Sequence, residues 1–344
     1  MKALILKQYN EFEYVDMDRP LITSDDDVLI NVKACGICGS DVHGMDGSTG
    51  RRIPPIVMGH EASGIIAEVG KQASEWKLGD HVTFDSTIYC GTCRFCRSGQ
   101  INLCDNRRVA GVSCADYRQH GAFAEYIVVP RHILYKLPAG LTFVQAAMVE
   151  ALSIAFHAVR RTPITLNDTA VVVGAGMIGL LVIQSLRLAG CGTIIAVDID
   201  DDKLSLAKKM GADVGFNSGK VTVKEKVFEL THSKGADCAF EVVGISPAVN
   251  TGIDVVKKGG SVTLVGNLSA TIDFPLQAVV TRELTLYGSC SSKGEYPACM
   301  DMIVRKKIDI DSFISAVAPL SEGASWFKRL YDKEPGLMKV ILTP

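Results

Sequence analysis

The chain has 344 residues, of which 47% are hydrophobic and 22% charged, and its formal net charge is -2 at pH 7. A chain of this length and composition can bury a large core and favours two domains over one, which excludes collagen-like and disordered proteins. Because lysines and arginines are scattered among the acids, the charge pattern offers no basic surface for a nucleic acid or an anionic membrane. A small molecule is therefore the expected partner.

The N-terminus and the cysteines indicate a cytoplasmic protein. Residues 1–7 contain only four apolar side chains between lysines, which is too few for a signal peptide. The uncharged stretch 169–186 contains three glycines, so a buried strand, turn and helix explain it better than a membrane span does. Eleven cysteines, an odd number, argue for metal ligands and core residues rather than a disulfide framework.

The pattern of apolar residues divides the chain into three parts and predicts an α/β fold. Residues 1–150 hold short strand-like runs between glycine and proline turns, as in a compact, mainly β domain. In residues 151–291 strand-like and helical runs alternate, which predicts a doubly wound parallel sheet. We expect residues 292–344 to pack back on the first domain. The predicted strands are 3–6, 28–32, 63–69, 81–84, 123–129, 170–173, 193–198, 238–242, 261–265, 284–287 and 337–342, and the predicted helices are 178–188, 203–210 and 297–305.

Two short turns carry side chains that suit a zinc ion. Cys38 follows the strand-like run 28–32 within a segment rich in reactive groups, and His60 and Glu61 follow Gly59 at a second turn. A thiolate, an imidazole and a carboxylate from separate turns can surround one ion and leave a position for water or substrate, as in a catalytic site. Glu150 is a candidate fourth ligand that could exchange with substrate. Taken singly, each residue also has an ordinary structural explanation.

Ser40 and His43 have the chemistry of a proton relay from the metal toward solvent. The alternative is an ordinary turn serine and a surface histidine. We expect Asp41 to orient the loop or a ligand rather than to act directly.

Four cysteines lie close together in the spacing C-x2-C-x2-C-x7-C, at Cys90, Cys93, Cys96 and Cys104. Four thiolates can close tetrahedrally around Zn²⁺ with no open position, as a structural site requires. The spacing differs from that of a bacterial iron-sulfur cluster, in which three residues precede a fourth cysteine followed by proline. A structural zinc is the expected occupant.

A glycine-rich segment points to a dinucleotide. Gly174, Gly176 and Gly179 form GxGxxG directly after an apolar strand and before a helix, with Met177 and Ile178 between the last two glycines. The three glycines permit a tight turn, close approach of the pyrophosphate, and helix–strand packing, and the helix N-terminus favours the phosphate charge.

The acid at the end of the next strand selects the form of the dinucleotide. Asp198 lies nineteen residues after Gly179, where a carboxylate accepts hydrogen bonds from the ribose of NAD and repels the 2′-phosphate of NADP. NAD is therefore preferred, although the neighbouring Lys203 could soften the exclusion of NADP.

With these motifs, and with Gly121-Ala-Phe-Ala-Glu-Tyr, the sequence resembles the zinc-dependent medium-chain dehydrogenase/reductase superfamily over essentially its whole length. The set Cys38, His60, Glu61 and Glu150 resembles the ligand pattern of the sorbitol dehydrogenase branch, to which threonine, butanediol and sugar-acid dehydrogenases are related. The resemblance implies a GroES-like catalytic domain over 1–150, a Rossmann domain over 151–291, a C-terminal return over 292–344, and a homodimer or homotetramer. It also implies that Val242, Gly266 and the segment 288–290 line the cofactor cleft.

The resemblance further implies a mechanism that agrees with the residues. Zinc lowers the pKa of a secondary alcohol, Ser40 and His43 carry the proton away, and hydride passes to NAD. We expect two zinc ions per chain and a polyol or sugar acid as substrate. A threonine or butanediol dehydrogenase is the nearer alternative, and a non-catalytic NAD-binding relative is the alternative of another class. Arginines in predicted loops could hold a substrate carboxylate or phosphate: Arg51, Arg52, Arg107, Arg108 and Arg118.

Overall fold

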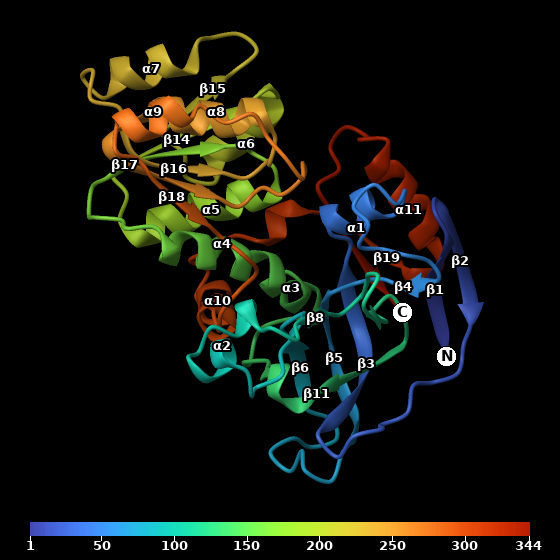
Figure 1. The fold of residues 1–344 in the computed structure, drawn as a ribbon. Helices are drawn as coiled ribbons and strands as arrows, with labels where there is room; N and C mark the ends of the chain where they lie inside the picture. The colour runs from blue at the N-terminus through green and yellow to red at the C-terminus, as the bar shows by residue number, and fades with distance from the viewer. The chain divides into compact units, whose positions relative to one another are not determined.

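The computed structural model describes residues 1–344, and their contacts divide the chain into two compact units (Figure 1). One unit comprises Met1–Glu150 and Lys293–Pro344, and the other comprises Ala151–Ser292. None of the helices is both long enough and apolar enough to cross a lipid bilayer.

The first unit is built on a mainly antiparallel sheet of seven strands, in which β3 is central. The strand order is β12-β6-β5-β3-β20-β19, β11 also pairs with β3, and only β19 and β20 run parallel. These strands are β3 (Asp27–Gly36), β5 (Glu61–Val69), β6 (His81–Phe84), β11 (Tyr126–Pro130), β12 (Leu134–Lys136), β19 (Ile314–Pro319) and β20 (Lys339–Thr343). The C-terminal strand β20 thus lies directly beside β3 in this sheet.

Shorter elements complete the first unit. Its remaining strands are β1 (Lys2–Gln8), β2 (Glu11–Asp16), β4 (Ile56–Val57), β7 (Thr87–Ile88), β8 (Arg108–Val109), β9 (Val112–Ser113) and β10 (Arg118–Gln119). Its helices are α1 (Gly39–Gly44), α2 (Arg94–Arg97), α3 (Phe143–Ala147), α10 (Tyr296–Val304) and α11 (Gly323–Tyr331), with four 3-10 turns at Ile101–Leu103, Arg131–Ile133, Asp311–Phe313 and Leu320–Glu322. Helix α4 (Val149–Arg161) begins in this unit. Fully buried aromatic and aliphatic side chains, including Ile30, Phe84, Phe123 and Phe327, form its core.

The second unit is a six-stranded sheet in which every neighbouring pair runs parallel. Its strand order, β15-β14-β13-β16-β17-β18, is the 3-2-1-4-5-6 order of a Rossmann fold when the strands are counted along the chain. The strands are β13 (Thr169–Val173), β14 (Thr193–Asp198), β15 (Val214–Asn217), β16 (Ala236–Glu241), β17 (Val256–Leu264) and β18 (Thr285–Gly288). The helices are α5 (Met177–Ala189), α6 (Asp201–Lys209), α7 (Val223–Leu230), α8 (Ser246–Val255) and α9 (Leu276–Thr281). The predicted fold class, a mainly β domain with a Rossmann domain, is confirmed.

One strand prediction was too long at its start. The sequence predicts a strand over 123–129, but β11 begins only at Tyr126. The backbone of Phe123 bonds elsewhere, since its N–H donates to Met58 and its carbonyl accepts from Leu4. The apolar run therefore continues across two different pairings, which periodicity alone does not separate.

Candidate active site and metal centres

The register of the central sheet brings the two predicted metal-binding turns together. Gly36, the last residue of β3, pairs with Glu61, the first residue of β5. On its other side Gly36 pairs with Ile341 of β20. Cys38 lies two residues beyond the end of β3, and His60 lies one residue before the start of β5. Because β3 ends beside the start of the antiparallel strand β5, the thiol, the imidazole and the carboxylate lie side by side.

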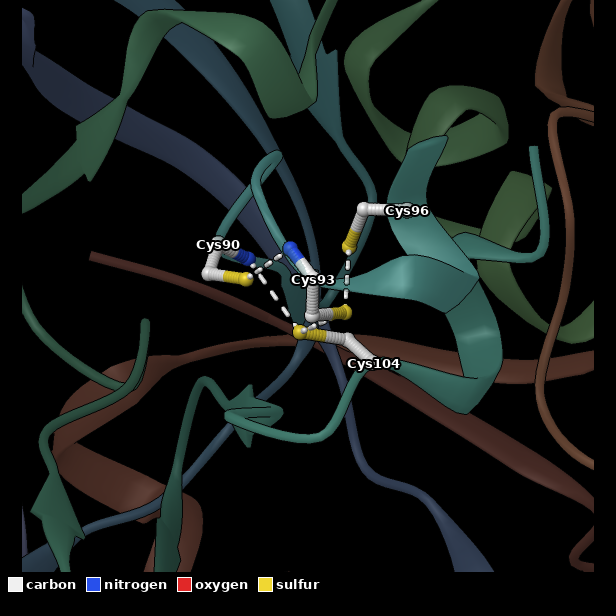
Figure 2. A group of neighbouring side chains, drawn as sticks. All are labelled: Cys90, Cys93, Cys96 and Cys104. Atoms are coloured by element: carbon white, nitrogen blue, oxygen red, sulfur yellow. Dashed lines mark hydrogen bonds between the residues drawn. The ribbon is translucent and has the colours of Figure 1, made fainter. Parts of the chain in front are cut away.

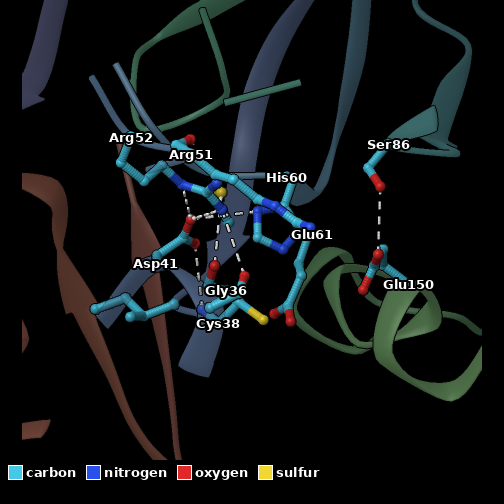
Figure 3. Close-up of polar contacts among 12 residues, drawn as sticks. Gly36, Cys38, Asp41, Arg51, Arg52, His60, Glu61, Ser86 and Glu150 are labelled. Atoms are coloured by element: carbon cyan, nitrogen blue, oxygen red, sulfur yellow. Dashed lines mark hydrogen bonds and ion pairs between the residues drawn. The ribbon is translucent and has the colours of Figure 1, made fainter. Parts of the chain in front are cut away.

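Cys38, His60 and Glu61 offer ligand atoms that all lie within 4.8 Å of one another (Figure 3). His60 and Glu61 are buried, and one carboxylate oxygen of Glu61, Oε1, is buried without a hydrogen-bond partner. A buried carboxylate oxygen with no donor is costly unless a cation lies beside it. The three atom types are those that zinc takes in catalytic sites. The residues present therefore fit a zinc ion held by three protein ligands.

A buried carboxylate orients His60. Oδ1 of Asp41 lies 3.4 Å from Nδ1 of His60, an ion-pair distance, and it also accepts hydrogen bonds from the guanidinium of Arg52 at 2.8 and 3.1 Å. The other ring nitrogen of His60 points toward Cys38 and Glu61 (Figure 3). The expectation that Asp41 acts through a ligand fits this arrangement. Arg52, which the sequence offered as a substrate-binding cation, is instead buried against Asp41 and is not available to a substrate.

The charges around His60 favour a cation. Burial alone would raise the pKa of Asp41, but His60 and Arg52 outweigh burial and hold that pKa well below its usual range. Burial would lower the pKa of His60, but Asp41 and Cys38 outweigh burial and raise that pKa. A raised histidine pKa means that the surrounding anions stabilise positive charge here. A metal ion at the free ring nitrogen would supply that charge.

The structure places Glu150 outside the group of three. It is the second residue of α4, and its Oε1 accepts a hydrogen bond from Ser86 Oγ at 3.3 Å. The pKa of Glu150 is raised to about 7, first by burial of the carboxyl group and then by the nearby carboxylates of Glu61 and Asp85. The raised pKa means that the negative charge of Glu150 is unfavourable in this environment, so a nearby cation would stabilise its ionised form. Glu150 therefore remains compatible with an exchangeable metal ligand.

Ser40 and His43 both lie on α1 and are both exposed. They are three residues apart and so share one helix face. The hydroxyl of Ser40 receives a long hydrogen bond of 3.4 Å from Arg52, and no hydrogen bond joins it to His43. The structure thus places both residues beside the metal-binding turn without joining them in a relay.

Lys339 is a charged residue of this site that was not predicted from the sequence. Its side chain is fully buried, and its Nζ lies 2.6 Å from Oε2 of Glu61. Burial would lower the pKa of Lys339, but the carboxylate of Glu61 outweighs burial and raises that pKa. A lone lysine in the apolar run 337–342 was the signal that could have identified it.

Gly36 offers a direct test of how Glu61 is positioned. A Cβ at Gly36 would lie 2.3 Å from Oε2 of Glu61, whereas a Cβ at Gly39 would meet nothing within 4 Å. We therefore expect Gly36→Ala to displace the carboxylate and lower zinc affinity by about tenfold or more, the usual cost of disturbing an oriented ligand. Gly39→Ala is the matched control and should bind zinc as the wild type does. Chelator competition measures both, and equal affinities would contradict this position of Glu61.

The four cysteines of the loop converge as the spacing predicts (Figure 2). Their sulfur atoms lie within 4.8 Å of one another, and Cys93 Sγ is 3.5 Å from Cys96 Sγ and 3.9 Å from Cys104 Sγ. A tetrahedron with zinc–sulfur bonds of about 2.3 Å has edges of about 3.8 Å. The sulfur atoms therefore fit a zinc ion.

Hydrogen bonds within the loop prepare part of it for metal binding. Hydrogen bonds, chiefly from Thr92, lower the pKa of Cys90 to about 5. Burial and the thiol of Cys93 raise the pKa of Cys96 to about 12. Four thiolates so close together repel one another, and a divalent cation among them would relieve that repulsion.

The glycine-rich turn of the second unit has the geometry of a phosphate site. Strand β13 ends at Val173, and α5 begins at Met177 with Gly176 as its N-cap and no side chain capping it. The first amides of a 13-residue helix thus remain available to an anion. A Cβ at Gly176 would meet nothing within 4 Å, which leaves room for a pyrophosphate.

The remaining cofactor residues lie around this turn. Asp198, the last residue of β14, accepts a hydrogen bond from Ala175 N at 2.7 Å, so its carboxylate is tied to the glycine turn. Lys203 lies on α6 and is exposed. Val242 packs where a Cβ on Gly174 or Gly179 would lie, at 3.0 and 3.2 Å, and Gly266 packs closely against Gly244. The residues present fit a dinucleotide.

Alanine substitutions at Gly176 and Gly179 should have different effects, one on cofactor binding and the other on the stability of the second unit. A Cβ at Gly179 would lie 1.9 Å from the carbonyl oxygen of Gly174, so we expect Gly179→Ala to destabilise the second unit by about 1–3 kcal/mol, as overpacking does. We expect Gly176→Ala to keep wild-type thermal stability but to weaken NAD binding, because its methyl group occupies the place of the pyrophosphate. Circular dichroism on heating and NADH titration by fluorescence test both. Unimpaired NAD binding by Gly176→Ala would contradict this site.

Two protein families and two curated relatives match this chain. Residues 24–139 match the alcohol dehydrogenase GroES-like domain family, and residues 178–305 match the zinc-binding dehydrogenase family. The sorbitol dehydrogenase of Halalkalibacterium halodurans is 35% identical over 351 residues, which cover 100% of this chain and 99% of that protein. The probable D-xylulose reductase A of Emericella nidulans is 34% identical over 334 residues, which cover 95% and 92%.

A solved structure agrees. Galactitol-1-phosphate dehydrogenase from Escherichia coli superposes with a TM-score of 0.92 at 26% identity and covers 100% of both chains. Two family matches, two full-length relatives and the shared fold leave one assignment. The chain belongs to the polyol dehydrogenase branch of the zinc-dependent medium-chain dehydrogenase/reductase superfamily, and it is an NAD-dependent alcohol dehydrogenase.

Proposed function

We propose that this enzyme oxidises a secondary alcohol group of a polyol, sugar alcohol or sugar acid to a ketone, with NAD as hydride acceptor. The observation that carries the proposal is the group Cys38, His60 and Glu61, with one buried Glu61 oxygen lacking a donor, in a chain that also has the dinucleotide turn. The full-length relatives named sorbitol dehydrogenase and D-xylulose reductase support the substrate class.

In this proposal Cys38, His60 and Glu61 hold the catalytic zinc, and Glu150 is the ligand that exchanges with substrate. Zinc bound there would act as a Lewis acid that lowers the pKa of the substrate hydroxyl. Asp41 keeps His60 in the orientation that leaves its second ring nitrogen for the metal. Cys90, Cys93, Cys96 and Cys104 hold a second, structural zinc, which makes two zinc ions per chain.

Proton and hydride leave the substrate by separate routes. The proton passes from the hydroxyl group to Ser40 and His43, whose exposed positions on α1 suit transfer toward water. The hydride passes from the carbinol carbon to the nicotinamide, so that one alcohol and one NAD yield one ketone, one NADH and one proton.

The second unit holds the cofactor in this proposal. The amides after Gly176 bind the pyrophosphate, Gly174 and Gly179 keep the turn compact, and Met177 and Ile178 form the first turn of the helix below it. Asp198 binds the adenosine ribose and favours NAD over NADP, with Lys203 nearby. Val242 and Gly266 line the site. We propose 151–291 as the NAD-binding domain, with 1–150 and the return 292–344 as the catalytic domain.

The test is NADH formation, followed by absorbance with polyols, aldonates, sugar phosphates, threonine and butanediol, each with NAD and separately with NADP. We expect activity with NAD on one polyol or sugar-acid class. Activity confined to threonine or butanediol would show that the enzyme is a threonine or butanediol dehydrogenase and not a polyol or sugar-acid dehydrogenase. A protein that binds NADH but holds no Cys38-dependent zinc and oxidises nothing would be a non-catalytic relative.

We also propose a homodimer or homotetramer in the cytoplasm. Strand β18 lies at the edge of its sheet, and nearby α9 exposes Leu276 and Val280, which are each 63% exposed. Exposed apolar side chains beside a strand edge suit association between copies. All eleven cysteines are free of disulfides, which suits a reducing compartment. Light scattering after size exclusion measures the oligomeric state.

A further inference from the structure

Lys339 joins the two segments that carry the proposed zinc ligands. Its Nζ donates to Oε2 of Glu61 at 2.6 Å and to the backbone carbonyl of Ile37 at 2.9 Å. Ile37 directly precedes Cys38 in the chain. The ammonium therefore contacts the start of β5 and the turn after β3 from a third strand, β20.

Stability alone gives little reason for this buried pair. Lys339 and Glu61 are 0% exposed, and a buried ion pair can often be replaced by apolar residues with no loss of stability. Strand β20 is moreover already fixed beside β3 by backbone pairing and by the bond from Ile37 N to Val340 O at 2.9 Å. The ammonium adds a constraint on one particular carboxylate.

The two oxygens of that carboxylate differ. Oε2 is held by Lys339, whereas Oε1 is buried, has no hydrogen-bond partner, and belongs to the side chain that lies with Cys38 and His60. A carboxylate fixed through one oxygen presents the other in a defined direction, as partners of metal ligands commonly do.

We propose that Lys339 is a positioning residue of the catalytic metal site, which holds Glu61 by one oxygen so that the other faces Cys38 and His60. The C-terminal segment thereby supplies a part of the site, and the positive charge of Lys339 offsets part of the negative charge of the ligands. This inference rests on the proposed metal role of Glu61.

The test is a mutant cycle read by metal binding rather than by turnover. Lys339→Met, Glu61→Gln, the double variant and Lys339→Arg are loaded with Co²⁺ in place of zinc. Affinity is measured by chelator competition, and the ligand field by visible absorption. The Co²⁺ bound by Cys38→Ser measures the contribution of the four-cysteine loop, and this contribution is subtracted from the signal of each other variant. Lys33→Met, at an exposed position of β3, is the matched control.

We expect Lys339→Met to weaken Co²⁺ binding at the Cys38-dependent site by about 10- to 100-fold and to change its absorption. Lys33→Met should change neither the Co²⁺ affinity nor the absorption. Lys339→Arg should retain most of the wild-type affinity because it keeps a cation. In the Glu61→Gln background Lys339→Met should change affinity little, since its target is already altered.

Two results would overturn the inference. One is a folded Lys339→Met protein with wild-type affinity and absorption, and the other is an equal loss in the wild-type and Glu61→Gln backgrounds. If Lys339→Met does not fold, the double variant, which buries no unpartnered charge, decides by comparison with Glu61→Gln alone. Wild-type protein without Cys38-dependent Co²⁺ binding would refute the metal site itself, and this inference with it.

Discussion

Replacing Cys38 by serine is expected to lower kcat/KM for alcohol oxidation by roughly a thousandfold or more, because the Lewis acid contributes several kcal/mol to the transition state. Serine is nearly the same size as cysteine, but its hydroxyl does not ionise at neutral pH and binds zinc poorly. Cys38 is only partly buried, so the fold should tolerate the change. Steady-state NADH formation with the substrate found in the panel measures the effect.

The control for this variant is Cys114→Ser. Cys114 is also partly buried and belongs to the same unit, but it has no place in either group of metal ligands. It should retain wild-type kcat/KM. A Cys38→Ser enzyme that keeps more than about a tenth of wild-type kcat/KM, which is under 1.4 kcal/mol of transition-state stabilisation, would show that this thiol is not a ligand of the reacting metal.

Replacing Arg52 by methionine is expected to destabilise the first unit by about 3–5 kcal/mol, because it removes the permanent positive charge from the buried Asp41 carboxylate and leaves only His60 beside it. Arg52 is 4% exposed and Asp41 is 0% exposed, and their closest atoms are 2.8 Å apart. The only tryptophans, Trp76 and Trp326, both lie in the first unit. Their fluorescence during urea unfolding therefore reports this unit without contribution from the second.

An exposed ion pair of the same unit provides the control. Lys328 and Asp332 lie 2.6 Å apart at i,i+4 on α11 and its C-cap, but both are largely solvent-exposed. Lys328→Ala should cost only about 0.3–0.5 kcal/mol. Adding Asp41→Asn to Arg52→Met should recover much of the loss, since no buried charge then remains. An Arg52→Met protein as stable as Lys328→Ala would contradict the buried pairing.

Local motifs predicted the parts of the molecule that are continuous in sequence. The glycine fingerprint placed a tight turn between β13 and α5, and it lies there because its strand, glycines and helix are adjacent in the chain. The four cysteines likewise lie within fifteen residues, and their sulfur atoms converge. Where few residues separate two interacting side chains or elements, local backbone geometry largely determines whether they meet.

Residues brought together by strand pairing were harder to predict. Lys339 meets Glu61 across 278 positions in the chain, through the pairing of β20 with β3, and no spacing rule connects them. Arg52 was expected to be free for a substrate, because no local pattern shows that its guanidinium is buried against Asp41. Both are charged residues in the interior, where pairing overrides the usual preference of such residues for solvent.

Short and amphipathic elements were also missed. The sequence pattern does not reveal several elements that the structure contains, among them β2, β15, β19, α7, α8 and α11. Strand β15 has four half-buried residues, and β2 is largely exposed, so neither shows a clear apolar period. Their strand conformation comes from pairing with β14 and β1, which is a tertiary effect.

The most direct test of the proposed catalytic site is the zinc content of wild type and Cys38→Ser, measured by elemental analysis on the same preparations used for NADH formation. We expect about two zinc ions per chain and activity in the wild type, and about one zinc ion without activity in the variant. A Cys38→Ser protein that keeps both its zinc and its activity would contradict the proposed catalytic site.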